Sequence, residues 1–203
     1  DGLAVRISNA AGLSSISFTL DYDPALLLID GVELALAGAS LMIDNSVPGH
    51  LTVSVSSIGG LGSAATDLVR LLASVPQDAG YGASHVLDLG NVVIDGNVTA
   101  GARDDDGLHV VAYAGDATGD GQYGAADVMA IQRVLIRVDS GFHAYPRIDP
   151  YVVGNVDGNS TLSSLDVRVL SQKLAGLPQA LIPAIPAVQE LATSLTEPIG
   201  LLS

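Results

Sequence analysis

The sequence predicts a mainly β chain, in which a β-sandwich is followed by a small α-helical part with a duplicated loop–helix motif. Three observations predict this class. Apolar residues alternate with a period of two up to residue 112, the spacing turns helical after Gly115, and a stretch rich in Asp, Asn and Gly precedes each helix. We therefore divide the chain into a sandwich at 1–112, a helical unit at 113–178 and a proline-punctuated tail or linker at 179–203.

The first part consists of short alternating runs. Between Ile16 and Tyr22 every second residue is apolar and polar residues stand between them, which is typical of a half-buried antiparallel strand. Turn-forming pairs such as Asp23-Pro24 separate the runs, and several short strands with regular turns favour a sandwich. Strands are expected at residues 3–7, 16–22, 51–55, 68–75, 85–94 and 108–113.

The second part has two expected helices. In each of them apolar residues recur three or four positions apart, so that they share one face. Gly176 and Pro178 end the second helix. The apolar faces comprise Val128, Ile131, Val134, Leu135 and Val138 in the first helix, and Val167, Leu170 and Leu174 in the second.

The composition is strongly acidic. The chain has 22 acidic and 8 basic residues, a formal net charge of −14, and nineteen of the acids are Asp. A surplus of Asp over Glu is typical of turns, helix caps and sites for hard cations. The charge argues against nucleic-acid binding and against docking on an anionic membrane, and no run of apolar residues is long enough for membrane insertion as a helix. The absence of Cys excludes disulfides and thiolate-ligated metals.

The first candidate site is the twelve-residue stretch 116–127. Side-chain oxygens stand at its first, third, fifth and twelfth positions, Gly121 holds the sixth position where the chain must turn sharply, and the seventh offers a backbone carbonyl. Ca²⁺ takes about 6–8 oxygen ligands, and this spacing wraps the chain around such a cation. The alternative is that these residues form only turns and N-caps. The candidate donors are Asp116, Thr118, Asp120, Gln122 through its carbonyl, and Asp127.

The second candidate site, residues 155–166, repeats the pattern before the second helix. Donors again occupy the first, third, fifth and twelfth positions, but two of them are amides and Ser160 replaces the turn glycine. Fewer charges predict a weaker cation site. The candidate donors are Asn155, Asp157, Asn159, Thr161 through its carbonyl, and Asp166.

These stretches resemble the duplicated repeat of dockerin modules. The resemblance lies in residues 115–121 (GDATGDG) and 154–159 (GNVDGN), and both loops close with Asp, as in dockerins, where an EF-hand has Glu. It implies that the ten donors bind two Ca²⁺ ions, and that the helices after the loops bind a cohesin. The connector 139–154 is longer than in the usual dockerin. The implied partner-binding face comprises Ala125, Ala126, Gln132, Arg133, Ser164, Leu165, Gln172 and Lys173.

The strand part resembles a second family. Residues 11–27 (AGLSSISFTLDYDPALL) are similar to the early strands and the Tyr-Asp-Pro corner of cohesin modules, although Ig-like sandwiches share such patterns. The resemblance implies a cohesin-like, Ig-like sandwich that lacks its first strand, because cohesins have a further strand before this point. One alternative is that the tail, residues 179–203, supplies that strand.

Together these features predict a non-catalytic, calcium-dependent protein–protein assembly module of a secreted or cell-surface bacterial protein, of the cellulosome-like kind linked to polysaccharide degradation. Its partner would be a cohesin-like or dockerin-like domain, in cis or in trans. The alternative is a calcium-stabilised structural unit at the end of a large surface or adhesin-like protein, with its two parts docked internally. Residues 1–112 carry a net charge of −10, and residues 113–178 carry a net charge of −2. Two Ca²⁺ ions would change the charge of the helical part to +2, which favours its association with the acidic sandwich.

We expect no enzyme and no small-molecule substrate. The four His residues show no metal-ligand spacing, no phosphate-binding loop or nucleophile elbow is present, and the acidic run 104–106 is more simply a turn than a catalytic pair. Without Trp, a sugar-stacking platform is poorly supplied. Since the chain begins with Asp1 and shows no signal peptide, we also expect it to be a piece of a longer protein. The four His are His50, His85, His109 and His143.

Overall fold

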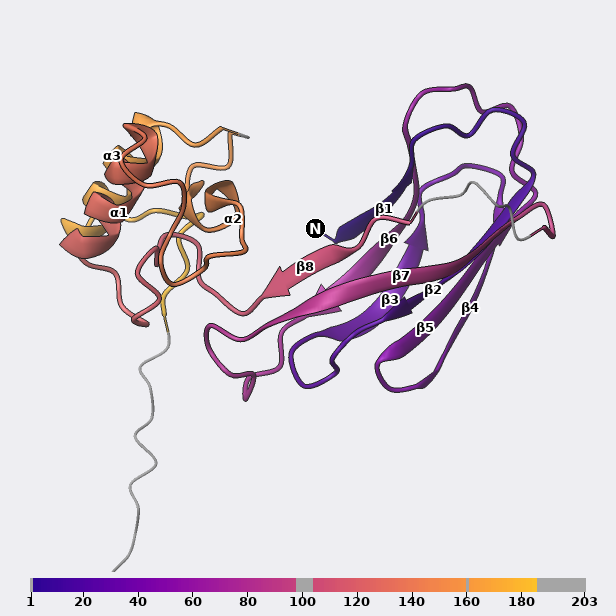
Figure 1. Ribbon diagram of the computed structural model, residues 1–203, viewed down its shortest axis with the longest axis horizontal. Helices are drawn as coiled ribbons and strands as arrows, with labels where there is room; N and C mark the ends of the chain where they lie inside the picture. Colours follow the sequence, from indigo (N-terminus) through magenta and orange to yellow (C-terminus); the bar gives the residue numbers. More distant parts are fainter. Residues whose placement is uncertain (1, 98–103, 160, 186–203) are drawn as a thin grey trace, which may run out of the picture.

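The computed structural model describes residues 2–97, 104–159 and 161–185. Two layers of strands form one part of the molecule and three short helices form the other (Figure 1). The described chain is mostly β-sheet, as the alternating pattern predicts. None of its described helices combines the length and apolarity needed to cross a membrane.

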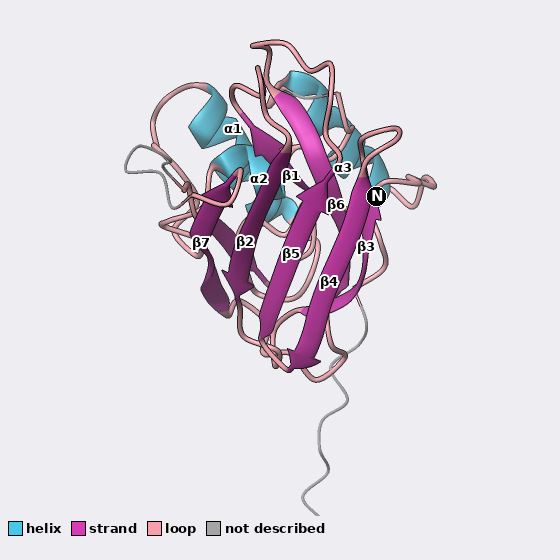
Figure 2. Cartoon of the chain, turned by 90° about the vertical axis from the view of Figure 1, so that its right-hand side faces the viewer, coloured by secondary structure: helices cyan, strands magenta, loops and turns pink. Residues whose placement is uncertain are grey.

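The strands form two antiparallel sheets. The larger sheet has the order β4-β5-β2-β7-β8 and the smaller one the order β1-β6-β3. In Figure 2 β4, β5, β2 and β7 lie side by side across the face of the larger sheet. The bounds are β1 Leu3–Ile7, β2 Ser15–Asp21, β3 Leu28–Leu34, β4 Ser40–Val47, β5 His50–Ser56, β6 Thr66–Ser74, β7 Ser84–Ile94 and β8 Gly107–Val110.

The sandwich core follows from the alternation in the sequence. Every second residue of β2 is buried, and the same holds for β5, with which β2 pairs in the register Phe18 to Val53. These side chains meet the inward face of β6, where Val69 is fully buried. Burying such side chains is the main source of stability for a two-layer sandwich.

Two strands, β3 and β4, were not expected. In β3 the alternation breaks where the register to β6 shifts, between Ile29 and Gly31. Strand β4 lies at the edge of the larger sheet, and all its residues except Leu41 are exposed. It therefore has no buried face that would produce an alternating pattern in the sequence. The last strand expected, 108–113, ends earlier, at Val110.

The helical part contains two equivalent segments. Helix α1 spans Ala125–Leu135 and helix α3 spans Ser164–Leu174, so that two helices of 11 residues begin 39 positions apart. Ile131 and Leu170, also 39 positions apart, are both fully buried, and the two helices pack against each other. The duplication seen in the sequence is therefore also a duplication of local structure and of core contacts.

The expected apolar face of the first helix is wrong at its end. Helix α1 stops at Leu135, and Arg137 adopts a left-handed conformation with φ of +59°. Val138 consequently lies outside the helix and is 56% exposed. The periodicity continues past the helix end because spacing alone does not register a change of backbone conformation.

The connector and the start of the tail complete the helical core. A short helix, α2 (Pro150–Gly154), lies in the connector, where Phe142 and Tyr145 are buried. Ile182 is buried in the same cluster, beyond residue 178 where we placed the end of the helical unit. The remainder of the tail, 186–203, lies outside the described residues, and so does any strand that it would supply.

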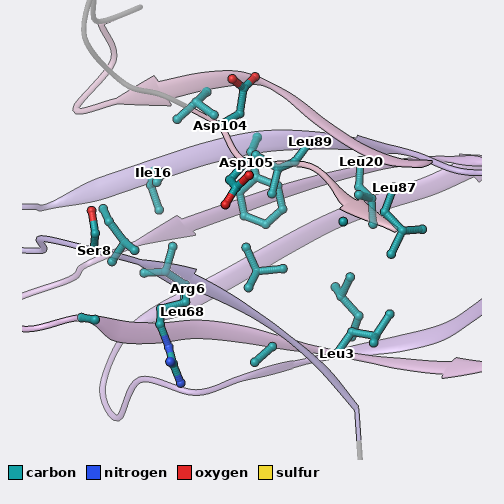
Figure 3. Close-up of a pocket in the computed structure, with 18 of the residues that line it drawn as sticks. Leu3, Arg6, Ser8, Ile16, Leu20, Leu68, Leu87, Leu89, Asp104 and Asp105 are labelled. Carbon is teal, nitrogen blue, oxygen red and sulfur yellow. The ribbon is translucent and has the colours of Figure 1, made fainter. Parts of the chain in front are cut away.

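A cavity of about 960 Å³ opens between the two sheets beside β1 (Figure 3). Its lining is mostly apolar and includes Leu3 from β1, Leu20 from β2 and Leu87 from β7. Asp104 and Asp105 also line it. Strand β1 is the edge strand of its sheet on this side.

Candidate metal centre

Three carboxylates converge in the first loop. Asp116, Asp120 and Asp127 each offer one oxygen, and these three oxygens all lie within 4.8 Å of one another. Asp116 and Asp127 are buried and Asp120 is exposed. The structure thus brings together the first, fifth and twelfth positions of the predicted loop.

Two glycines let this loop fold over its first carboxylate. Oδ1 of Asp116 accepts a hydrogen bond from the N–H of Gly119 at 2.8 Å, and Oδ2 accepts one from Gly121 at 2.8 Å. Both glycines have positive φ, +69° and +76°. A Cβ at position 119 would lie only 2.8 Å from that of Ala144. Residues with side chains would strain this turn.

Asp127 closes the loop and caps α1. Its Oδ2 accepts the N–H of Gly124 at 2.8 Å, and its Oδ1 accepts both the N–H and the hydroxyl of Thr118, at 2.9 and 2.8 Å. Thr118 therefore touches the carboxylate cluster, whereas the side chain of Gln122 is exposed. Capping and cation binding are compatible here, since a carboxylate has about four lone-pair sites.

The second loop repeats this arrangement with fewer charges. Asp166 is fully buried, and its oxygens accept the N–H groups of Val156 and Ser163 at 2.9 and 2.7 Å. The amide of Asn159 donates to Asp157 at 2.7 Å. The hydroxyl of Thr161 donates to Asn159, also at 2.7 Å. Ser160, at the turn position, lies outside the described residues.

One oxygen in the second loop lacks a partner. Oδ1 of Asn155 is buried and accepts no hydrogen bond within the described part of the chain. Buried polar atoms are nearly always paired, so an orphaned acceptor at the first position of the loop calls for a positively charged or donating group. The donors of both loops are all oxygens, which suits a hard cation such as Ca²⁺ and not a thiolate-binding or imidazole-binding metal. The residues present therefore fit the predicted cation.

Tyrosine hydroxyls surround the first loop. Tyr81, from the loop between β6 and β7, donates to Oδ2 of Asp116 at 2.5 Å, and Tyr123 donates to the carbonyl of Ala114 at 3.2 Å. Burial, followed by the hydrogen bond to Asp116, raises the pKa of Tyr81 far above its ordinary value. Burial and then the charge of Asp116 raise the pKa of Tyr123 to about 12. Both hydroxyls therefore remain protonated donors at neutral pH.

The expected partner face is only partly free. Ala125 and Ala126 are exposed and line a groove of about 430 Å³ together with Met129, which is 58% exposed. Gln132 and Ser164 are also exposed, and Leu165 is half-buried. The remaining three residues are engaged within the chain. Arg133 pairs with Asp139 at 2.6 Å, Gln172 accepts from Gln179 at 3.2 Å, and Lys173 donates to the carbonyl of Ile182 at 3.0 Å.

Sequence reasoning missed two features. Tyr81 lies 35 residues before Asp116, and nothing in its surroundings signals the contact. His85 and His109, which have no metal-ligand spacing, face each other across β7 and β8 with ring centroids 5.1 Å apart. Burial lowers the pKa of both histidines, and the charge of His85 lowers the pKa of His109 further. The His pair follows from strand register and the Tyr81 contact from the packing of a loop, neither of which spacing along the chain reveals.

Comparisons with known proteins give structural likenesses only. No family model and no curated protein matches the chain significantly. A non-cellulosomal cohesin from the archaeon Archaeoglobus fulgidus is similar with a TM-score of 0.39 and 22% identity, covering 46% of this chain and 67% of its own. A cohesin module from a family 33 glycoside hydrolase of Clostridium perfringens has a TM-score of 0.39 and 17% identity, covering 49% and 73%.

A third likeness is to a cohesin of Acetivibrio cellulolyticus, the third cohesin of ScaC, solved in complex with the ScaB dockerin. It has a TM-score of 0.42 and 12% identity, and covers 54% of this chain and 90% of its own. All three structures are therefore cohesin modules that align with about half of this chain.

Proposed function

We propose that this chain is a non-catalytic, calcium-binding module for protein–protein assembly. The observation that carries the proposal is the convergence of the Asp116, Asp120 and Asp127 oxygens within 4.8 Å. Three carboxylates this close repel one another unless a cation lies between them. The second loop, 39 residues later, supports the same reading through the orphaned oxygen of Asn155.

Two Ca²⁺ ions would be held by this chain. In the first loop the cation would be bound by the three carboxylates with Thr118 and the carbonyl of Gln122. In the second it would be bound by Asn155, Asp157, Asn159, the carbonyl of Thr161, and Asp166. Because the unfolded chain has no preformed site, calcium should stabilise the fold.

The exposed part of α1 is the surface that we propose for the partner. Ala125, Ala126 and Met129 border a groove on this helix, and small side chains allow another backbone to come close. By its resemblance to dockerins, the helical part would take a cohesin-like domain of a secreted or surface-attached bacterial system. Gln172 and Lys173 contribute less than the resemblance implies, since residues 179–182 engage both.

A second candidate function is a calcium-stabilised structural unit whose two parts are docked on each other. It is favoured by one observation, the hydrogen bond from Tyr81 in the sandwich to Asp116 in the first loop. In that case the assembly partner of the helical part would be the sandwich of the same chain. Both candidates use the same metal loops and make different predictions about binding in trans.

The test is native mass spectrometry and thermal melting of the intact chain in calcium and in EDTA. We expect two ions per chain and a higher melting temperature in calcium. Absence of bound metal together with an unchanged melt would refute the proposal.

Titration with isolated cohesin modules separates the two candidates. Binding that Ala126→Arg abolishes, and that the exposed control Val138→Arg retains, supports assembly in trans. A calcium-stabilised monomer that binds no cohesin supports the structural unit.

A further inference from the structure

The loop between β6 and β7 contacts the first metal loop. It lies at the end of the sandwich that faces the helical part (Figure 1). There, the hydroxyl of Tyr81 donates to Oδ2 of Asp116 with 2.5 Å between the two oxygens. A hydroxyl–carboxylate distance this short is typical of a charge-assisted hydrogen bond. A residue of the strand part therefore donates a hydrogen bond to the carboxylate at the first position of the proposed calcium loop.

The direction of this hydrogen bond is determined by the neighbours of Tyr81. Its hydroxyl oxygen accepts the N–H of Tyr113 at 3.3 Å and the hydroxyl of Tyr145 at 3.5 Å. With both acceptor sites engaged, the proton of Tyr81 is directed to the carboxylate. The ring of Tyr113 stacks on that of Tyr81, with centroids 5.6 Å apart, and fixes the orientation of the phenol.

The backbone holds Tyr81 in place as well. The N–H of Gly82 donates to the carbonyl of Val111 at 2.8 Å, and the N–H of Val111 donates to the carbonyl of Ala83 at 2.9 Å. These bonds continue the β7–β8 hairpin, in which Ser84 pairs with Val110. The hairpin thus extends to within a few residues of Asp116 and leaves little freedom between the sandwich and the metal loop.

One donor to Asp116 comes from outside its loop. The carboxylate also accepts hydrogen bonds from Thr118, Gly119, Asp120 and Gly121 within the loop. The Asp116 side chain is fully buried, and its Oδ2 accepts from only two groups, the N–H of Gly121 and the hydroxyl of Tyr81, within the described residues. The first donor belongs to the loop, whereas the second comes from the other part of the molecule. Groups that hydrogen-bond to a metal ligand orient it, and their loss costs about 10–100-fold in metal affinity.

We propose that Tyr81 is a positioning residue for the first calcium site, so that cation binding there and docking of the β6–β7 loop on the helical part stabilise each other. The inference rests on the proposed calcium binding. It follows from linkage: a contact that favours the metal-binding arrangement of Asp116 must itself be favoured when the metal binds. Calcium binding in the first loop of the helical part then stabilises the docked position of the β6–β7 loop, which belongs to the sandwich.

The test compares two Tyr→Phe variants by calorimetric titration with Ca²⁺. Both are made in an Asp157→Ala background, which removes a donor of the second loop and leaves the first site to be measured. Tyr81→Phe deletes the hydroxyl that reaches Asp116. Tyr113→Phe is the matched control, because it belongs to the same ring stack and its hydroxyl makes no hydrogen bond within the described residues. We expect about 10–100-fold weaker binding for Tyr81→Phe and unchanged binding for Tyr113→Phe.

Amide hydrogen exchange provides a readout of docking. In the parent chain, calcium should slow the exchange of the Gly82 and Val111 amides, which join the β6–β7 loop to residue 111. Tyr81→Phe should lose this calcium dependence and the control should keep it. Equal calcium affinities in the two variants, or an equal loss of the calcium dependence of exchange, would overturn the role of the Tyr81 hydroxyl. A parent chain that binds no Ca²⁺ would instead overturn the proposed function.

Discussion

Replacing Asp120 by Asn tests whether the first loop is built for a cation. Asp120 is exposed, and the only hydrogen bond of its side chain among the described residues is from the N–H of Gln122 to Oδ1 at 2.9 Å, which an Asn oxygen can keep. The change therefore removes one negative charge from the cluster with Asp116 and Asp127 at nearly constant shape. If these residues form only a turn, the stability should hardly change.

The expected magnitude follows from the spacing of the carboxylates. Two unit charges within 4.8 Å repel by about 1 kcal/mol in bulk water, the dielectric suited to an exposed group. Asp120 has two such neighbours, so the metal-free variant should gain about 1–2 kcal/mol, and less at high salt. In calcium the variant lacks a charged ligand. Each tenfold loss of affinity then reduces the stabilisation by excess Ca²⁺ by about 1.4 kcal/mol.

The assay is urea unfolding followed by circular dichroism, in EDTA and in excess Ca²⁺, at low and high salt. The control is Asp30→Asn, an exposed Asp on β3 that makes no side-chain hydrogen bond in the described part of the chain. We expect Asp120→Asn to raise the stability of the metal-free chain and to reduce the gain in stability on adding calcium. No change in either quantity, as in the control, would refute the reasoning.

Two further predictions concern other parts of the molecule. Because burial lowers the pKa values of His85 and His109 in the folded state, these residues bind fewer protons there than in the unfolded chain. Stability should therefore fall as the pH drops through their ordinary pKa of 6.5 toward the lowered folded values. Denaturant titrations should show this slope, and replacing both residues by Thr should flatten it. Ile182→Ala should cost about 2–5 kcal/mol of unfolding free energy, since Ile182 is buried among the helices. The same change at its exposed neighbour Leu181 should be nearly neutral; equal effects would show that the tail does not pack there.

The strands that alternation predicts are those with one buried face. Residues 16–22 and 51–55 appear as β2 and β5 because a half-buried strand must place every second side chain inside. Strand β4 shows no such signal, since it is an exposed edge, and β3 loses its signal at the bulge near Gly31. In the helical part, Val138 continues the period of 3.6 although the left-handed Arg137 has already ended the helix.

The metal loops are predictable because their geometry is local. Donors at alternate positions around Gly121 fold back on themselves within twelve residues, and the structure brings Asp116, Asp120 and Asp127 together. Binding of calcium by these residues stays a prediction. The sequence predicts the partner-binding face less well, because the contact of Lys173 with the carbonyl of Ile182 depends on how the tail packs.

The sequence by itself determined the division into a strand part and a helical part, the duplicated loops and their oxygen donors, since each depends on spacing along a short stretch of chain. Only the tertiary structure decided which residues from different stretches meet. The pairing of His85 with His109 follows from strand register, and the contact of Tyr81 with Asp116 follows from the hairpin that carries the β6–β7 loop to the helical part. Such contacts depend on how distant segments pack, so no local sequence pattern predicts them.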